Sequence, residues 1–272
     1  MKNHFPDWSS IIKDQALRIK SRYQKFVPEI IRNFVWRLMR KPVWNARLKI
    51  GTKLILPGLT FNLDGFNTTH FVGFRQDAKF NSAFSAAISS LPSNMVGPST
   101  AIEWRAHICT WAANQAAGIE GDFIECGVWH GTLSKTICEY ADFKSNNRKF
   151  YLVDSWGGVE NHPKYDLDIF NQVKARFSMY PQVKLVRGLV PEVLEQIPST
   201  KIAYLSIDMN GSLPELAALN FFYPKMVKGG VIYFDDYGWG YPELRKVVDE
   251  FFSDKPETLL HFPSGNSIVI KT

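Results

Sequence analysis

The chain is poor in cysteine and has no hydrophobic run long enough to cross a membrane. Its 272 residues include three cysteines, and the spacing of Cys109, Cys126 and Cys138 fits neither a metal knuckle nor a disulfide framework. A membrane-spanning helix needs ~20 consecutive apolar residues, and no segment approaches that length. The first residues also lack the apolar stretch and small-residue cleavage site of a signal peptide. We therefore expect free thiols and a cytoplasmic protein.

Positive charge is concentrated at the N-terminus. Residues 1–60 contain thirteen Lys and Arg against three Asp and Glu, whereas the whole chain has 32 against 26. The spacing of apolar residues predicts two basic amphipathic helices, over residues 9–27 and 30–39. Residues 1–50 could therefore make peripheral contact with the anionic inner face of a membrane. Alternatively, the helices pack on the body or across a homo-oligomer. No recognised nucleic-acid-binding module accompanies the charge, so we expect no nucleic-acid partner.

The most informative segment covers residues 121–131, where a short apolar strand ends at Glu125 and a glycine turn leads into a helix. Such turns bind nucleotide-containing cofactors, because glycine lets the ligand approach the backbone and the helix offers free N–H groups. The glycines are spaced Gly-x-x-x-Gly, not Gly-x-Gly-x-x-Gly as in dinucleotide dehydrogenases. A negative residue before the turn suits a sulfonium amino acid better than a pyrophosphate, which predicts S-adenosylmethionine. The expected contacts are Glu125, Cys126, Gly127, Val128, Trp129 and Gly131.

Strands and helices alternate from residue 121 onward, which predicts an α/β fold with a doubly wound, mostly parallel, Rossmann-like sheet. We expect seven strands, at residues 123–125, 149–153, 183–187, 202–207, 230–234, 258–262 and 267–270. We expect helices at residues 81–90, 101–117, 133–140, 167–178, 191–196, 213–222 and 242–253. The last two strands have only a short link between them, so they should form an antiparallel terminal hairpin. Residues 61–272 are then one domain, and residues 1–60 are a basic helical extension.

An acidic residue follows the second strand of this sheet. Asp154 lies 23 residues after Gly131, and an acidic residue about 20 residues past the glycine turn can bind ribose hydroxyls. Ser155 adjoins it, and the ring of Trp156 could stack near adenine. The alternative is that Asp154 is a turn or capping residue.

Carboxylates also follow the fourth and fifth strands. Asp208 and the pair Asp235 and Asp236 should meet at the carboxyl edge of the sheet, where ligands bind. Three such carboxylates repel one another, so a cation is their natural partner, and oxygen ligands favour Mg²⁺ or Ca²⁺. The alternative is that Asp235 caps a helix and Asp208 only positions the methionine part of the cofactor.

Residues 121–251 resemble the macrocin O-methyltransferase family, in which S-adenosylmethionine methylates sugar hydroxyls. The resemblance is carried by the order and spacing of residues 121–131, 153–155, 186–188, 191–194, 207–208, 223–225, 229–238 and 245–251. It implies a magnesium ion held by Asp208, Asp235 and Asp236, and it adds Gly188 to the cofactor-binding residues. Two positions depart from the family pattern: His130 stands where Arg is frequent, and Met209 stands where a further acidic residue is usual.

Together these features predict a metal-assisted methyltransferase that acts on a sugar, a glycan or a natural-product glycoside, for example in polysaccharide biosynthesis. Asp208 can act as both metal ligand and base, with His130 and His162 as other candidate bases. Two alternatives remain open at this point. One is another nucleotide-cofactor enzyme of Rossmann type. The other is a membrane- or assembly-associated protein whose methyltransferase-like body is degenerate.

Overall fold

The computed structural model describes residues 61–63, 66–97, 100–143, 147–157, 169–239 and 242–272. Thr60–Thr272 form one compact unit. The basic arm expected over residues 1–60 lies outside the described residues, so its helices and its membrane contact stay predictions. In the described part of the chain, no helix is both long and apolar enough to span a membrane.

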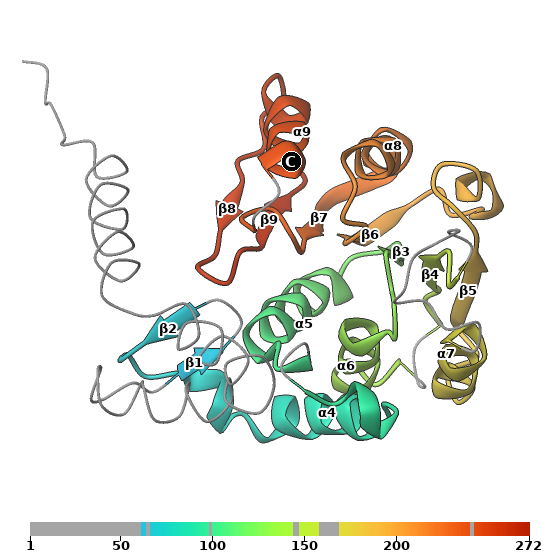
Figure 1. Cartoon of the computed structure of the whole chain (residues 1–272). Helices are drawn as coiled ribbons and strands as arrows, with labels where there is room; N and C mark the ends of the chain where they lie inside the picture. The colour runs from blue at the N-terminus through green and yellow to red at the C-terminus, as the bar shows by residue number, and fades with distance from the viewer. Residues whose placement is uncertain (1–60, 64–65, 98–99, 144–146, 158–168, 240–241) are drawn as a thin grey trace, which may run out of the picture. The chain divides into compact units, whose positions relative to one another are not determined.

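Seven strands form the central sheet in the order β5-β4-β3-β6-β7-β9-β8 (Figure 1). Five of them run parallel, and β9 is antiparallel to both of its neighbours. This confirms the predicted fold class and the terminal hairpin. The strands are β3 (Asp122–Cys126), β4 (Phe150–Asp154), β5 (Val183–Arg187), β6 (Ile202–Ile207), β7 (Met226–Phe234), β8 (Leu260–His261) and β9 (Ser267–Ile270).

The two strands of the terminal hairpin occupy different positions in the sheet. The antiparallel strand is β9, and it lies between β7 and β8, so the outermost strand is β8. β9 makes four residue pairs with β7, whereas β8 makes two pairs with β9. The more extensively paired strand therefore occupies the inner position.

Helices cover both faces of the sheet (Figure 1). Residues that alternate along a strand point to opposite faces, so Phe123 joins the core with α5, α6 and α7, and Ile124 joins the core with α8 and α9. The helices are α4 (Ala78–Ser89), α5 (Glu103–Ala117), α6 (Thr132–Tyr140), α7 (Ile169–Phe177), α8 (Ser212–Phe222) and α9 (Pro242–Phe252).

The chain reverses its direction of winding at β3. It passes from β3 to β4 and β5 on one side, and then returns to place β6 on the other side of β3. Ligands of such sheets bind in the crevice outside the carboxyl ends of the strands at this point. The topology thus directs attention to the residues that follow β3, β4, β6 and β7.

Two segments depart from the sequence-based assignment. The stretch before α4 contains an unpredicted antiparallel pair, β1 (Phe61–Leu63) with β2 (Phe66–Thr68). The helix expected at residues 191–196 is reduced to a 3₁₀ turn at Leu194–Gln196. Ile197 precedes a proline and is extended, and that neighbour disfavours helical backbone.

Candidate active site

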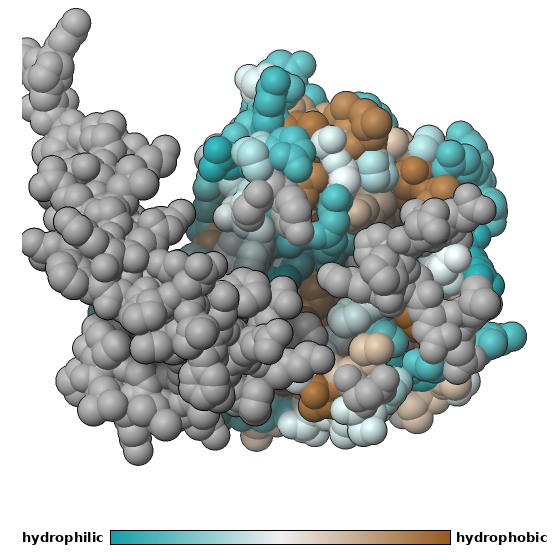
Figure 2. All heavy atoms as spheres, viewed as in Figure 1, coloured by the Kyte–Doolittle hydropathy of each residue, from teal (hydrophilic) through white to brown (hydrophobic). Residues whose placement is uncertain are grey.

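A cavity of about 630 Å³ opens at the carboxyl ends of β3, β4, β6 and β7. In the space-filling view, the described surface is hollowed below these strand ends, and both hydrophilic and hydrophobic residues border the hollow (Figure 2). Ten of the residues singled out in the sequence line the cavity: Glu125, Gly127, Val128, Trp129, Asp154, Ser155, Gly188, Asp208, Asp235 and Asp236.

The glycine turn after β3 requires glycine at position 127 for reasons of space as well as conformation. Gly127 has a φ of 87°, and a Cβ there would lie 1.7 Å from the carbonyl oxygen of Asp208. The turn and the end of β6 are therefore in direct backbone contact. Any side chain at this position would displace Asp208, the residue expected to bind the cation.

Asp154 holds the glycine turn in place. Its Oδ2 accepts hydrogen bonds from the backbone N–H groups of Val128 and Trp129, both at 2.7 Å, and its Oδ1 accepts one from Trp156 at 2.8 Å. A carboxylate has about four acceptor positions, so a further hydrogen bond to a ligand hydroxyl remains available. Both readings of this residue are thus compatible: it organises the turn, and it faces the cavity.

Four of the residues singled out do not line the cavity. Trp156 is fully buried, packs against Phe170 and donates its indole N–H to the carbonyl of Trp129. Cys126 belongs to the core on the α8 and α9 face. Gly131 precedes α6 in a left-handed conformation, and a Cβ there would meet the ring of Phe177. These three residues pack on the side of the glycine turn that faces away from the cavity. The fourth residue is His130.

His130 is buried beside Trp129, and its Nε2 has no hydrogen-bond partner among the described residues. Burial, followed by the positive charge of Arg176, lowers the pKa of the imidazole. Among the described residues, His130 is not one of those that line the cavity, so its role as a base stays a prediction. His162, the other histidine considered, lies outside the described residues.

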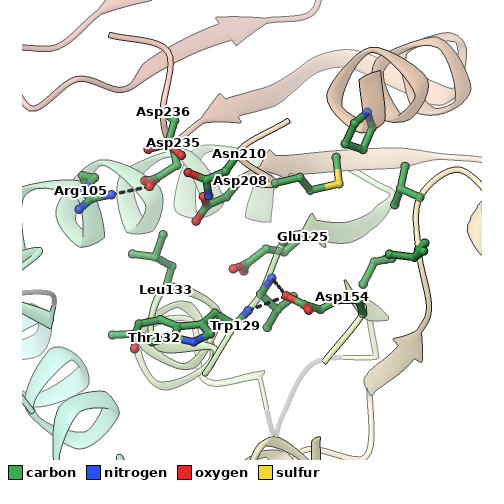
Figure 3. Close-up of a pocket in the computed structure, with 18 of the residues that line it drawn as sticks. Arg105, Glu125, Trp129, Thr132, Leu133, Asp154, Asp208, Asn210, Asp235 and Asp236 are labelled. Atoms are coloured by element: carbon green, nitrogen blue, oxygen red, sulfur yellow. Dashed lines mark hydrogen bonds and ion pairs between the residues drawn. The ribbon is translucent and has the colours of Figure 1, made fainter. Parts of the chain in front are cut away.

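Glu125 lies between the two ends of the cavity (Figure 3). Its side chain is 2% exposed, and the hydroxyl of Ser134 donates a hydrogen bond to Oε2. Burial raises the pKa of this carboxyl to about 8. The ionised form of a buried carboxyl is favoured by a positive charge placed next to it. Glu125 is therefore suited to meet a cationic group of a bound ligand.

The three aspartates expected to bind a cation do converge. Asp208, Asp235 and Asp236 each offer an oxygen, and these oxygens lie within 4.8 Å of one another. Burial and repulsion from the other two carboxylates raise the pKa of Asp208, and burial followed by Asp235 raises that of Asp236 to about 6. Figure 3 shows the group at the end of the cavity opposite Asp154.

Asp235 is held on both of its oxygens. Arg105 of α5 reaches Oδ2 at 2.5 Å, and the hydroxyl of Tyr233 donates to Oδ1 at 2.6 Å. Asn266 donates to the Tyr233 hydroxyl at 2.7 Å, so the hydroxyl proton is directed to Asp235. Sequence reasoning missed Arg105, because the ion pair joins residues 130 positions apart and no local motif signals it.

Glu215 of α8 was also missed. It is 4% exposed, and burial raises the pKa of its carboxyl to about 7, although the backbone of the loop after β6 opposes this shift. Its backbone N–H donates to the carbonyl of Gly211 at 3.1 Å, which ties α8 to that loop, where Asn210 has a φ of 53° and lines the cavity. An acidic residue in the first turn of the predicted helix was the available signal.

The donor set fits a divalent cation. All three groups are carboxylates, hard oxygen ligands of the kind that Mg²⁺ and Ca²⁺ take. Arg105 forms an ion pair with one of them, and among the described residues no ion pair reaches Asp208 or Asp236. The remaining negative charge is what a bound cation would compensate.

The sequence model of the family described as macrocin-O-methyltransferase (TylF) matches residues 90–258. The chain belongs to this family. The match confirms the resemblance drawn from the motifs, and it covers the glycine turn, Asp154 and all three aspartates. Among curated proteins, none matches the chain.

Solved structures show the same fold. The O-methyltransferase NovP is 20% identical with a TM-score of 0.57, and the match covers 74% of this chain and 99% of NovP. CalS11, a TDP-rhamnose 3'-O-methyltransferase of calicheamicin biosynthesis, is 18% identical with a TM-score of 0.51. The match covers 74% of this chain and 96% of CalS11. A putative caffeoyl-CoA O-methyltransferase from Staphylococcus aureus is 12% identical with a TM-score of 0.52. That match covers 74% of this chain and 95% of the other.

Proposed function

We propose that this methyltransferase uses S-adenosylmethionine to methylate a hydroxyl of a sugar, and that a divalent cation, Mg²⁺ first among the candidates, assists the reaction. The observation that supports this most is the arrangement around one cavity. A glycine turn with a buried glutamate lies next to three clustered aspartates, in a chain of the macrocin-O-methyltransferase family. CalS11, which has the same fold, is a TDP-rhamnose 3'-O-methyltransferase.

The glycine turn forms the donor side of this proposal. S-adenosylmethionine supplies a methyl group activated by a positive sulfonium. Glu125 would meet a positive group of the donor. Asp154 keeps Val128 and Trp129 in position and would accept a hydrogen bond from a ribose hydroxyl. Ser155 and Gly188 complete this side of the cavity. Methyl transfer is an in-line displacement, so correct positioning by these residues supplies much of the rate.

The acidic cluster forms the acceptor side. A bound Mg²⁺ would lower the pKa of a sugar hydroxyl and orient its oxygen. Asp208, Asp235 and Asp236 would hold this ion. Asp208 lines the cavity, which suits a group that takes a proton from the acceptor. Asp208 therefore serves as the base, in preference to His130.

Transfer of label from methyl-labelled S-adenosylmethionine to a panel of glycosides and sugar nucleotides tests this proposal. We expect label in the sugar with wild-type protein, and loss of transfer after chelation that added Mg²⁺ restores. Asp208→Asn should abolish transfer and keep the affinity for S-adenosylhomocysteine. Full activity in the presence of a chelator would contradict the role of the cation, and transfer to thiols or amines alone would contradict the sugar hydroxyl.

For residues 1–60 we propose a basic helical arm that makes peripheral contact with the cytoplasmic face of an anionic membrane through residues 1–50. The excess of Lys and Arg in this segment supports the proposal. Vesicles of phosphatidylglycerol should bind the full chain on flotation and should not bind a chain that lacks residues 1–50. Equal flotation of both would leave packing on the body or homo-oligomer contacts as the role of the arm.

A further inference from the structure

The three clustered carboxylates are not equivalent. Asp235 is nearly buried and carries two partners, whereas no ion pair reaches Asp208 or Asp236 among the described residues. The ion pair of Asp235 with Arg105 is short and shielded, with side-chain exposures of 3% and 17%. A shielded ion pair is stronger than one in water, because the effective dielectric is lower. A cation that binds here therefore meets a carboxylate that already has a positive partner.

The position of Arg105 is set by its surroundings. It lies in the first turn of α5, and its guanidinium rests over the ring of Trp239, with Cζ 5.2 Å from the ring centroid. The Trp239 ring in turn packs on the turn between β8 and β9, where a Cβ on Gly265 would lie 2.5 Å from the indole nitrogen. The guanidinium thus lies between a carboxylate and an aromatic ring, both of which attract it.

We propose that Arg105 competes with the cation for Asp235 and so sets the affinity of the site. The inference rests on the proposed cation-assisted function. Before a cation binds, Arg105 compensates part of the repulsion among the aspartates. When a cation binds, the guanidinium shares or releases Oδ2 of Asp235. It remains in the cavity that it lines, next to Trp239.

The competition follows from charge and distance. A cation held by one oxygen from each of the three aspartates would lie close to the Asp235 carboxylate, and therefore close to the guanidinium bound to its Oδ2. Like charges at such distances repel, and the repulsion is large where water is excluded. Removal of the Arg105 charge should therefore strengthen cation binding. If Arg105 instead only positioned Asp235 for the cation, its removal should weaken binding. The two roles therefore predict opposite changes in cation affinity when Arg105 is removed.

Calorimetric titration of the full chain with Mn²⁺, without donor or acceptor, tests the proposal. We expect Arg105→Gln to bind Mn²⁺ about tenfold more tightly than wild type, because a tenfold change lies within the range of coupling measured between groups of one ion-pair network. Arg105→Lys keeps the charge but loses the planar guanidinium, so its affinity for Mn²⁺ should lie between those of wild type and Arg105→Gln. Lys246→Gln removes an exposed positive charge from α9 and should leave the affinity unchanged. Trp239→Leu removes the ring that holds the guanidinium, and should tighten binding a few-fold even if Arg105→Gln does not fold.

An equal or weaker affinity in Arg105→Gln and Trp239→Leu, with wild-type protein binding Mn²⁺, would overturn the competition and leave the cation-assisted function intact. Absence of Mn²⁺ binding in every protein, with methyl transfer that survives chelation, would overturn both the competition and the cation-assisted function. The two failures are therefore distinguishable in one set of titrations and one control assay.

Discussion

Replacement of Gly127 by alanine tests whether the backbone contact between the glycine turn and β6 holds the site together. The new Cβ would lie 1.7 Å from the Asp208 carbonyl oxygen and 2.4 Å from its carbon. The left-handed backbone costs a non-glycine residue about 1–2 kcal/mol, and forced overpacking adds about 1–3 kcal/mol. We therefore expect Gly127→Ala to lose about 2–5 kcal/mol of unfolding free energy, measured by urea denaturation.

The same substitution should disable catalysis, because relief of the clash moves Asp208 and the turn apart. A displacement of about 1 Å in an active site can cost about 100-fold in rate. Gly118→Ala is the matched control: Gly118 has helical backbone, and a Cβ there would meet nothing within 4 Å. This control should be as stable as wild type or slightly more so. Wild-type stability and methyl-transfer rate in Gly127→Ala would refute the reasoning.

Three further predictions concern the carboxylates. Asp154→Ala releases two backbone N–H groups of the glycine turn and that of Trp156 after β4, so its affinity for S-adenosylhomocysteine should fall at least ~10-fold in a calorimetric titration, a loss of ~1.4 kcal/mol. Tyr233→Phe removes the hydroxyl between Asn266 and Asp235, and should cost about 1–3 kcal/mol of unfolding free energy because buried polar groups lose their partner. The folded-state pKa of Asp236, about 6, lies above the usual value of about 4, so the folded protein holds more protons between these values. Stability in the presence of chelator should therefore decrease as pH rises from 4 to 7, by at most about 2 kcal/mol from this group. Asp236→Asn should show a smaller decrease, and an equal pH dependence in both proteins would contradict the assignment.

The sheet could be predicted from sequence because its inner strands β4, β6 and β7 contain apolar runs followed by turn residues. The positions of Asp154, Asp208 and Asp235 at strand ends then followed from the rule that parallel strands share a carboxyl edge. Secondary structure was predicted less well in the segments outside these strands. The pair β1 and β2 was missed, and a helix was expected where proline leaves only a 3₁₀ turn.

The site was predicted less completely than the fold, because sequence order does not reveal which side chains meet through space. Arg105 reaches Asp235 from a helix that precedes the whole sheet, and Asn266 reaches Tyr233 from the terminal hairpin. Trp156 was expected to face adenine, but its ring is buried behind the turn. Periodicity indicates where an element lies and gives little information on the direction of a loop side chain.

The most direct test of the proposed function is a calorimetric titration of wild-type protein and Glu125→Gln with S-adenosylhomocysteine, with NAD as the comparison ligand. We expect wild-type protein to bind S-adenosylhomocysteine and not NAD. We expect Glu125→Gln to bind it about tenfold more weakly, since a charge-assisted contact is lost. No binding of S-adenosylhomocysteine by folded wild-type protein at millimolar concentration, or equal affinity for NAD, would contradict the account.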